Sequence, residues 1–531
     1  MADLLQDFIE SSAASRPEAV ALVHRDREIP YRELDRTVRS VAGGLRAQGL
    51  APGERVAVYL PKVPEAVYAM FGTAAARGAF VPVNPLLKPH QVAHILRDSG
   101  ARFLVTTADR GDLLAETLAD CPDLRRAVIT DRAPEALPAA LEGWGMAWPS
   151  LLEGDGADAP GRGIDADMAA ILYTSGSTGR PKGVILSHRN MVAGADSVAR
   201  YLENHPGDRL LAALPFSFDY GLSQLTTAFS SSAGVVLMDY LLPRDVLKAV
   251  SRHGITGLAA VPPLWNQLAT LEWPQEARDT LRYVTNSGGA MPGATLRSLQ
   301  QTLPRTRIYL MYGLTEAFRS TYLPPEELER RPGSMGKAIP NAEIQVVRED
   351  GTECAPGEPG ELVHRGALVA MGYWNDPEKT AVRFRPAPGQ PRELPNPEIA
   401  VWSGDQVRKD EDGFLYFITR QDEMIKSSGY RISPTEVEEA LYGHGRIAQA
   451  VALGVPHPDL GQAIVVVIQA EDPSLTGESL LGHCKRELPP FMVPGSVRFK
   501  DTLPHNANGK IDRRALAEEF NNLFQDQARE S

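Results

Sequence analysis

The sequence predicts an α/β protein: a large N-terminal domain of layered, mostly parallel sheets with helices and a small β subdomain, followed by a small, mobile α+β C-terminal domain. Three observations predict this class. Short apolar runs rich in β-branched residues alternate with stretches of helical spacing up to about residue 340. Closely spaced strands with turn signals follow, and another small α/β pattern begins near residue 421. Alternating strands and helices imply parallel sheets covered on both faces, which bind ligands at the carboxyl ends of their strands.

The large domain is expected to contain buried strands and then an antiparallel β subdomain at about 340–420. Turn signals such as Glu349-Asp350-Gly351 separate the strands of that subdomain, and the Pro-rich stretch Pro386–Pro397 is expected to be an exposed loop. The predicted strands are Arg55–Leu60, Phe80–Val83, Arg102–Thr107, Met168–Leu172, Gly234–Asp239, Gly257–Val261, Arg307–Met311, Ala342–Val347, Gly360–Val363 and Phe414–Ile418.

The small domain is expected to open with a capped helix. Ser433 is placed as the N-cap, Pro434 as the first helical residue and Glu436 as the partner of a capping box. Val451–Val455 and Ala463–Gln469 are expected to be strands. These patterns place the domains at residues 1–420 and 421–531.

Composition excludes several classes of protein. The 531 residues are 43% hydrophobic and 23% charged, which is ordinary for a globular protein. A net charge of −12 argues against a nucleic-acid coat protein or a basic membrane arm. Three widely separated cysteines argue against a disulfide framework or structural zinc. With acids near the N-terminus and no long apolar run, we expect a soluble cytoplasmic protein.

A Gly- and hydroxyl-rich stretch, Tyr173–Gly183, directly follows the expected strand Met168–Leu172. Such a loop can present N–H and O–H donors to phosphate oxygens without interference from Cβ atoms, although a flexible turn is the alternative. The stretch lacks the order of a Walker A loop. The candidate phosphate-binding residues are Thr174, Ser175, Gly176, Ser177, Thr178 and Gly179, with Lys182 and Arg180 adding positive charge.

This stretch resembles the phosphate loop of the AMP-forming adenylating superfamily, which includes acyl-CoA synthetases, nonribosomal peptide adenylation domains and firefly luciferase. Over much of its length the chain also looks like acyl-CoA ligases associated with exosortase A loci, through Pro215–Gly221 and Thr285–Pro292. Similar motifs follow in the family's order: Ser287–Pro292, Met311–Glu316, Gly360–Leu362, Trp402–Asp405, Arg420–Asp422, Ile425–Arg431, Leu488–Pro494 and Asn508–Arg513.

The resemblance implies an ATP site and a magnesium site. Glu316 would hold Mg²⁺, Thr315 would contact the α-phosphate, and Lys182 would be catalytic. Two anions meet when a carboxylate attacks ATP, so fixed cations and a metal are needed. For the nucleoside, Tyr312 would pack on adenine beside the backbone of Gly288, Gly289 and Ala290, Asp405 would accept the ribose hydroxyls, and Arg420 would support the ribose.

The resemblance also implies that the small domain moves. Lys510 would reach into the active site for adenylation, although a lone surface lysine is normally solvated. The domain would then rotate about Asp422 and present the face that carries Lys426 for thioester formation. Gly429 would line the pantetheine tunnel, with a simple turn as the alternative.

The acid pocket is expected between Leu214 and Thr315. Phe218 occupies the position where many acyl-CoA synthetases carry histidine, and Asp219 after it is more typical of enzymes that activate amino acids. Asp219 would bind a substrate ammonium if it points inward; an outward or N-capping aspartate is the alternative. Trp265, Met311 and Gly313 are candidate wall residues, and the first two could equally be core.

These residues lead to one reaction class with several open choices. We expect an ATP-dependent, AMP-forming acid–thiol ligase that uses ATP and Mg²⁺ and transfers the acyl group to CoA or a phosphopantetheinyl carrier protein. An acyl-CoA synthetase and an enzyme that loads amino acids or β-amino acids on a carrier remain alternatives. A non-catalytic nucleotide-binding homologue is a remote third possibility, and no residue specifically supports a luciferase-like oxidation.

Overall fold

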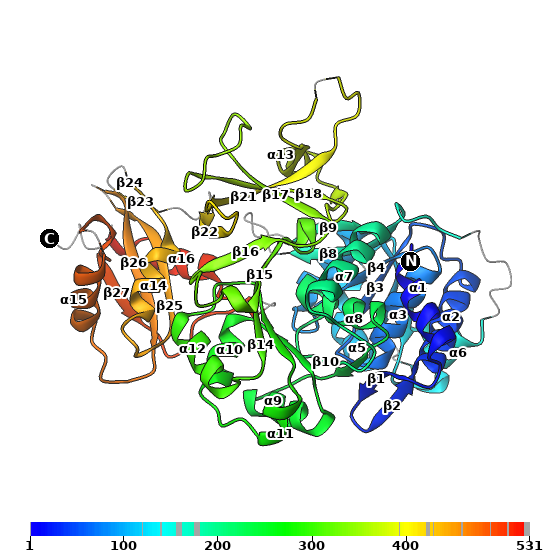
Figure 1. Cartoon of the computed structure of the whole chain (residues 1–531). Coiled ribbons are helices and arrows are strands. Elements are labelled where there is room, and N and C mark those ends of the chain that lie inside the picture. Colours follow the sequence, from blue (N-terminus) through cyan, green and yellow to red (C-terminus); the bar gives the residue numbers. More distant parts are fainter. Residues whose placement is uncertain are drawn as a thin grey trace.

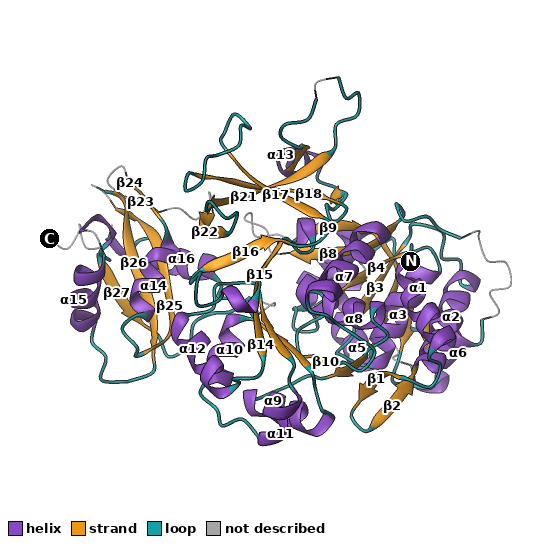
Figure 2. Ribbon diagram, in the orientation of Figure 1, coloured by secondary structure: helices purple, strands orange, loops and turns teal. Residues whose placement is uncertain are grey.

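The computed structural model confirms the predicted α/β class, with layered sheets and helices in a large N-terminal body and a smaller body at the C-terminal end (Figure 1). Figure 2 shows the same view by type of element. The structure describes residues 2–118, 120–137, 141–154, 162–174, 181–391, 393–420, 425–427, 430–457, 460–488, 490–506 and 509–524.

The first sheet contains the strand that precedes the expected phosphate loop. Its order is β19-β9-β8-β4-β3-β5-β6-β7; neighbours from β8 to β7 pair in parallel, and β9 and β19 add in the antiparallel sense. The strands are β3 (Arg55–Tyr59), β4 (Ala79–Pro82), β5 (Ala101–Thr106), β6 (Arg126–Ile129), β7 (Gly145–Ala147), β8 (Met168–Thr174), β9 (Lys182–Ser187) and β19 (Gly372–Tyr373).

The second sheet supplies the strands that end at the expected acid and adenine sites. Strands β14-β13-β12-β10-β11-β1 are parallel, and β2 adds as an antiparallel edge. These strands are β1 (Val20–His24), β2 (Arg27–Pro30), β10 (Arg209–Ala212), β11 (Gly234–Leu237), β12 (Gly257–Ala260), β13 (Tyr283–Asn286) and β14 (Arg307–Tyr312).

The expected antiparallel β subdomain is present as a continuation of the second sheet. Strands β15 and β16 connect β14 to β22, so the order runs on through β21, β18 and β17. These strands are β15 (Thr321–Leu323), β16 (Ser334–Ala338), β17 (Ala342–Val347), β18 (Pro359–Gly366), β20 (Phe384–Pro386), β21 (Ile399–Lys409) and β22 (Leu415–Arg420).

One hydrophobic core links the two sheets, and a second lies beyond the first sheet. Val56 and Val58 of β3 enter the shared core, whereas Ala57 and Tyr59 enter the second, as alternation along a strand requires. Helices α1, α3, α7 and α8 pack between the sheets (Figure 1). The helices are α1 (Leu5–Ser15), α2 (Tyr31–Ala47), α3 (Pro64–Ala75), α4 (Pro89–Ser99), α5 (Ala108–Leu118), α6 (Trp148–Leu152), α7 (His188–Tyr201), α8 (Asp219–Ser230), α9 (Pro243–His253), α10 (Pro262–Ala269), α11 (Gln275–Thr280), α12 (Gly293–Thr302) and α13 (Pro377–Arg383), with 3-10 turns η1 (Pro134–Ala136), η3 (Thr315–Ala317) and η4 (Pro325–Glu327).

The C-terminal body has its own sheet and its own cores. Its strand order is β24-β23-β26-β25, and β27 pairs with β26. The β25 edge lies against the large body, where Asn266 Nδ2 donates to the carbonyl of Ala448 at 3.4 Å. The elements are β23 (Ile425–Ser427), β24 (Tyr430–Ile432), α14 (Pro434–Tyr442), β25 (Ile447–His457), β26 (Gly461–Ala470), α15 (Gly477–Glu487), η5 (Pro490–Met492), β27 (Ser496–Phe499) and α16 (Arg513–Phe520).

The helix expected after Ser433 forms, but its capping box does not. Ser433 is the N-cap and Pro434 the first residue of α14, and the Ser433 side chain makes no capping hydrogen bond. Its hydroxyl donates instead to the carbonyl of Ile418 within β22. The serine therefore connects the two bodies, a long-range contact that the local pattern could not reveal.

Among the described residues, no helix combines the length and the hydropathy needed to cross a bilayer.

Candidate active site

The expected metal ligand Glu316 lies in a cluster formed where the two sheets meet. Glu316 belongs to η3 after β14, Lys182 begins β9, and Tyr373 lies on β19, which pairs with β9. Lys182 Nζ donates to Glu316 Oε1 at 3.1 Å and to the Tyr373 hydroxyl at 2.7 Å, while that hydroxyl donates to the same carboxylate oxygen at 2.6 Å. Burial opposes ionisation of Glu316, but Lys182 and Tyr373 outweigh it and hold the pKa of this carboxyl below its usual range. The cluster therefore keeps a carboxylate charged in a shielded position.

The donor set around Glu316 fits magnesium. No group of three or more His, Cys, Asp or Glu side chains gathers as a metal cage within the described part of the chain. Mg²⁺ usually takes one or two protein carboxylates and completes its shell with water and substrate phosphates. A single ionised Glu316 close to the expected phosphate loop matches that requirement.

The expected ribose ligand Asp405 is held from two sides. Asp405 on β21 lies opposite Arg420 on β22 in the antiparallel pair, and Arg420 Nε is 3.1 Å from its Oδ1. The Tyr312 hydroxyl at the end of β14 donates to Asp405 Oδ2. Burial, together with the negative charge of Asp405, raises the pKa of Tyr312 well above its usual value, so the phenol keeps its proton.

The motif Gly360–Leu362 holds the two residues that precede Asp405. Glu361 Oε1 accepts a hydrogen bond from the Gly404 N–H at 2.8 Å, and the Leu362 carbonyl accepts one from the Ser403 hydroxyl at 2.7 Å. Gly404 has φ +70°, and a Cβ atom there would lie 1.9 Å from Arg383 Nη1. Glycine is therefore required for the turn that aims Asp405 into the site.

The expected adenine loop follows β13 and is open to the site. Gly289 and Ala290 are exposed, and the Gly289 carbonyl accepts a hydrogen bond from Asn286 Nδ2 at 3.0 Å. Gly288 has φ +83°, in the region that favours glycine.

Lys510 reaches this loop from the small body. The turn that carries it is closed by bonds from Asn506 N to the Lys510 carbonyl at 2.7 Å and from Lys510 N to Asn506 Oδ1 at 3.1 Å. Lys510 Nζ lies 5.2 Å from the centre of the Phe218 ring, and a Cβ atom on Gly288 would be 3.0 Å from Lys510 Cε. Burial and the nearby Arg420 lower the pKa of Lys510, whereas Asp219, Asp405 and Glu316 oppose that shift. The structure thus brings Lys510 together with the residues expected to bind nucleotide and acid.

Asp219 points into a buried region at the start of α8. Its side chain belongs to the first residue of the helix, after the N-cap Phe218, and the residue is 5% exposed. Burial raises the pKa of the Asp219 carboxyl, and the charges of Arg319 and Lys510 act in the opposite direction. The outward orientation left open by the sequence is therefore not the one observed.

Arg319 is a buried cation that the sequence did not single out. It is 1% exposed, its guanidinium lies 4.8 Å from the Tyr220 ring, and Nη1 donates to Ser287 Oγ at 3.3 Å. The preceding residue Phe318 has φ +56° and ψ −49°, and Arg319 N donates across it to the Ala317 carbonyl at 2.6 Å. Such a γ-turn is strained for a residue with a side chain, so the chain holds Arg319 in place at a cost.

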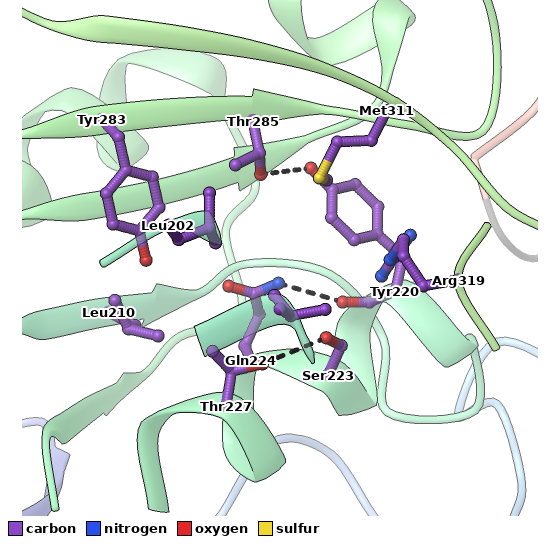
Figure 3. A pocket seen from close by; sticks show the side chains of 11 residues that line it. Leu202, Leu210, Tyr220, Ser223, Gln224, Thr227, Tyr283, Thr285, Met311 and Arg319 are labelled. Carbon is purple, nitrogen blue, oxygen red and sulfur yellow. Dashed lines mark hydrogen bonds between the residues drawn. The ribbon is translucent and has the colours of Figure 1, made fainter. Parts of the chain in front are cut away.

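A cavity of about 10 Å³ lies next to Tyr220 and Arg319 (Figure 3). Met311 lines it and accepts a hydrogen bond from the Tyr201 hydroxyl at 3.0 Å. Gly313 faces Arg319, because a Cβ atom there would be 3.2 Å from the Arg319 Cα. Trp265 does not line this cavity: it is fully buried, and its indole N–H bonds to the carbonyls of Ala260 and Thr285 at 3.0 and 3.1 Å. We therefore assign Trp265 to the core.

Several expected residues lie at or beyond the limits of the described chain. Thr174 ends β8, and its buried Oγ1 has no hydrogen-bond partner in the part of the chain that the structure describes. Thr315 begins η3 and is half-buried. The structure places the backbone of Lys426 in β23. The expected residues outside the described chain are Ser175, Gly176, Ser177, Thr178, Gly179, Arg180, Asp422 and Gly429.

Sequence reasoning missed Tyr373 and Arg319. Tyr373 gave no motif signal, since its role depends on pairing between β19 and β9. Arg319 gave no motif signal either, because the burial of the segment Ala317–Thr321, in which it is the single charge, is known only from the structure.

Comparisons with known families match most of the chain. The model described as "AMP-binding enzyme" matches residues 9–374, and the model described as "AMP-binding enzyme C-terminal domain" matches residues 436–510.

Curated relatives of similar length include two CoA ligases. A long-chain-fatty-acid–CoA ligase from Escherichia coli O157:H7 is 31% identical, and the match covers 97% of this chain and 94% of that protein. A feruloyl-CoA synthase from Amycolatopsis sp is 31% identical over 94% of this chain and 95% of that protein. A linear gramicidin synthase from Brevibacillus parabrevis is 30% identical over 96% of this chain, which corresponds to 6% of that much larger protein.

Solved structures share the whole architecture. An o-succinylbenzoate coenzyme A synthetase from Bacillus subtilis, in complex with ATP and a magnesium ion, aligns with a TM-score of 0.80 and 27% identity, covering 96% of this chain and 99% of that one. An anthranilate CoA ligase in complex with anthranoyl-AMP aligns with a TM-score of 0.85 and 24% identity over 97% of each chain, which shows the shared fold.

Proposed function

The chain belongs to the AMP-binding enzyme family and is an AMP-forming acyl-CoA synthetase that uses ATP, Mg²⁺ and CoA, and on this premise we propose which of its residues carry each step. The observation that carries the proposal is the meeting of Lys510 from the small body with Gly288 and Phe218 of the large body. The charges of Arg420, Asp219, Asp405 and Glu316 all act on Lys510 there.

Adenylation joins two anions. A carboxylate oxygen of the acid attacks the α-phosphorus of ATP, the bond from that phosphorus to the bridging oxygen breaks, and acyl-AMP and pyrophosphate form. We assign Lys510 to the developing negative charge between carboxylate and α-phosphate, because a buried ammonium is worth most where water is excluded. Thr315 is proposed to donate its hydroxyl to the α-phosphate, and Lys182 to contribute charge from the side of Glu316.

The nucleoside is proposed to bind along the second sheet and the β subdomain. Asp405 has two acceptor oxygens for the ribose hydroxyls, with Arg420 and Tyr312 fixing its orientation. Adenine would lie beside the backbone of 288–290, with Tyr312 against it. The buried Thr174 Oγ1, which has no hydrogen-bond partner among the described residues, and the stretch 175–179 after it would take the phosphates.

Magnesium would be held by Glu316. When bound, Mg²⁺ would offset the charge of the phosphate oxygens, and Lys182 and Tyr373 keep the Glu316 carboxylate ionised and oriented for it.

Thioester formation is proposed to follow a rotation of the small domain about Asp422. The thiol sulfur attacks the acyl carbon and AMP leaves with the bonding electrons. In the present arrangement β25 faces the large body, while the β23–β24 hairpin, which carries Lys426, lies at the opposite edge of the small sheet. A rotation would exchange these edges and bring Lys426 and Gly429 to the thiol tunnel. We place the enzyme in the cytoplasm, which supplies ATP and CoA and keeps Cys121, Cys354 and Cys484 reduced.

Activation of an amino acid for a carrier protein is the second candidate. The observation in its favour is that Asp219 is buried without an ion-pair partner within 4.0 Å among the described side chains. A substrate ammonium would supply that partner.

ATP–pyrophosphate exchange over fatty, aryl, α-amino and β-amino acids tests the function and separates the candidates. CoA and a holo carrier protein are then offered as thiols. If Asp219 binds an ammonium, Asp219→Ala abolishes exchange with amino acids and spares the others. Asp245→Ala, which removes an aspartate from the first turn of α9, is the matched control. No exchange with any acid would overturn the proposed function.

A further inference from the structure

The Arg319 guanidinium has far fewer partners than it has donors. A guanidinium carries five N–H donors, and the bond to Ser287 Oγ is its single hydrogen bond within the described chain. Arg319 Nε is buried with no partner there, and no described carboxylate oxygen lies within 4.0 Å of the guanidinium nitrogens. A buried cation in this state is costly unless a ligand completes it.

The fold keeps Arg319 in this costly position by two separate means. Phe318 adopts the strained γ-turn, and its ring packs where Gly194 lacks a side chain, since a Cβ atom there would be 2.5 Å from Phe318 Cδ1. Gly313 leaves the room that Arg319 needs from the other side. Strain retained beside a reactive site is characteristic of functional positions.

The region around Arg319 is small and lined by both polar and apolar side chains. Its cavity of about 10 Å³ offers about the space that is needed to hold one water molecule. Figure 3 shows Arg319 beside Tyr220 and hydroxyl groups along the wall. The polar side chains of this wall are Tyr220, Ser223, Gln224, Thr227, Tyr283 and Thr285. Its apolar wall residues are Val198, Leu202, Leu210 and Met311. A long aliphatic chain would find no space there without displacing side chains of the wall.

Electrostatics joins this region to the reacting carboxylate. Asp219 lies within electrostatic range of both Arg319 and Lys510. Two cations therefore act on Asp219, and the proposed function assigns Lys510 to the reacting end of the substrate. Arg319 is then available to bind the other end of the substrate.

We propose that Arg319 is a specificity-determining residue that binds a second carboxylate of the substrate, so that the enzyme activates short dicarboxylic acids through one of their two carboxyl groups. This inference rests on the proposed function and names its substrate class. A carboxylate matches the guanidinium fork with two parallel hydrogen bonds and supplies the missing negative charge. A substrate ammonium would instead be repelled by Arg319.

Exchange with acids of matched length tests this inference. The sets are succinate, butyrate and γ-aminobutyrate, and glutarate, valerate and δ-aminovalerate. In the wild-type enzyme we expect kcat/KM for a diacid to exceed that of its monoacid by about 10²-fold or more, because the monoacid leaves Arg319 unpaired. A better rate with the monoacid, the amino acid, or a fatty or aryl acid would overturn the inference. Absence of exchange with every acid would instead overturn the proposed function.

Variants separate recognition from a structural role. Arg319→Met should raise the KM for the diacid by about the same factor, while the KM for ATP and the use of the monoacid change little. Arg319→Lys should raise the KM for the diacid less than Arg319→Met does, because lysine keeps the positive charge but lacks the two parallel N–H donors of the guanidinium. Arg305→Met, an exposed arginine of the same domain, is the matched control. An equal loss with every acid would mean that Arg319 is only structural and would overturn the inference. If Arg319→Met does not fold, two other results test the inference. They are the order of kcat/KM among the acids in the wild-type enzyme and the effect of Gly313→Ala, which crowds Arg319.

Discussion

The side of this site that we propose for the nucleotide and the side that we propose for the acid differ in how their charges are satisfied. On the nucleotide side each carboxylate already has partners: Glu316 bonds with Lys182 and Tyr373, and Asp405 with Arg420 and Tyr312. On the acid side Asp219 and Arg319 are buried, and the described chain gives neither of them an ion-pair partner within 4.0 Å.

The difference shows which interactions belong to the fold and which are left to the substrate. Paired, ionised groups can receive ATP without rearrangement, and such preorganisation is the main source of electrostatic catalysis. Under-paired groups make binding depend on a ligand with complementary charge, because a ligand without it leaves them buried and unsatisfied. On our proposal, the nucleotide side thus sets the reaction, and the acid side selects the substrate.

The largest effect is expected from removing Lys510, the cation that we place between the nucleotide side and the acid side. Lys510→Ala should lower ATP–pyrophosphate exchange by about 10³-fold, because it removes the ammonium that we assign to the charge developing between carboxylate and α-phosphate. ATP binding, measured by calorimetry, should be retained. Lys500→Ala, a lysine of the same body that pairs with Glu519, is the control. Exchange at the wild-type rate in the Lys510→Ala variant would contradict the assignment.

A substitution that affects the nucleotide side alone should have the next largest effect. Asp405→Ala leaves Arg420 and Tyr312 without their shared partner and removes both ribose acceptors, so the KM for ATP should rise by about 10²-fold. The KM for the acid should change little, and Asp350→Ala in an exposed turn should change neither value. A rise confined to the KM for the acid would show that Asp405 belongs to the other side.

A smaller change tests the contact between the bodies. Gly288→Ala would place a Cβ atom 3.0 Å from Lys510 Cε at a residue with φ +83°, so Lys510 must withdraw. Adenylation should fall by about tenfold, whereas thioester formation from supplied acyl-AMP should be retained. Gly293→Ala, whose Cβ atom would meet nothing closer than Arg297 Nη1 at 3.4 Å, is the control. Equal losses in both half-reactions would show that the loop matters for folding rather than for docking.

Most of the fold could be predicted because the strands are buried on both faces. Runs such as Gly234–Asp239 and Arg307–Met311 are apolar apart from Asp239 and Arg307 at their ends, and the observed strands β11 and β14 differ from them by one or two residues at an end. The capping box at Ser433 failed because the hydroxyl found a partner 15 residues away, in a different body. Local patterns cannot report such competition.

The site, like the fold, has one part that could be predicted from the sequence and one part that could not. The nucleotide side could be anticipated because its residues sit in motifs, and Asp405, Tyr312 and Arg420 indeed meet. Arg319 lies only three residues beyond Glu316, yet its importance depends on burial, on the γ-turn at Phe318 and on the lack of a partner. None of these properties follows from residue types in order.

The pH dependence of the two half-reactions gives the smallest and most specific effect. Burial lowers the pKa of Lys510, and the ammonium is the form that neutralises charge, so adenylation should fall as pH rises through this lowered pKa. Thioester formation from supplied acyl-AMP is proposed to use the other edge of the small domain and should lack this alkaline decline. Lys510→Arg should move the decline of adenylation to higher pH, because a guanidinium stays protonated. Initial rates of both half-reactions between about pH 7 and 10 provide the measurement. A decline that is shared by both half-reactions, or that persists unchanged in the arginine variant, would assign the titration to a group other than Lys510.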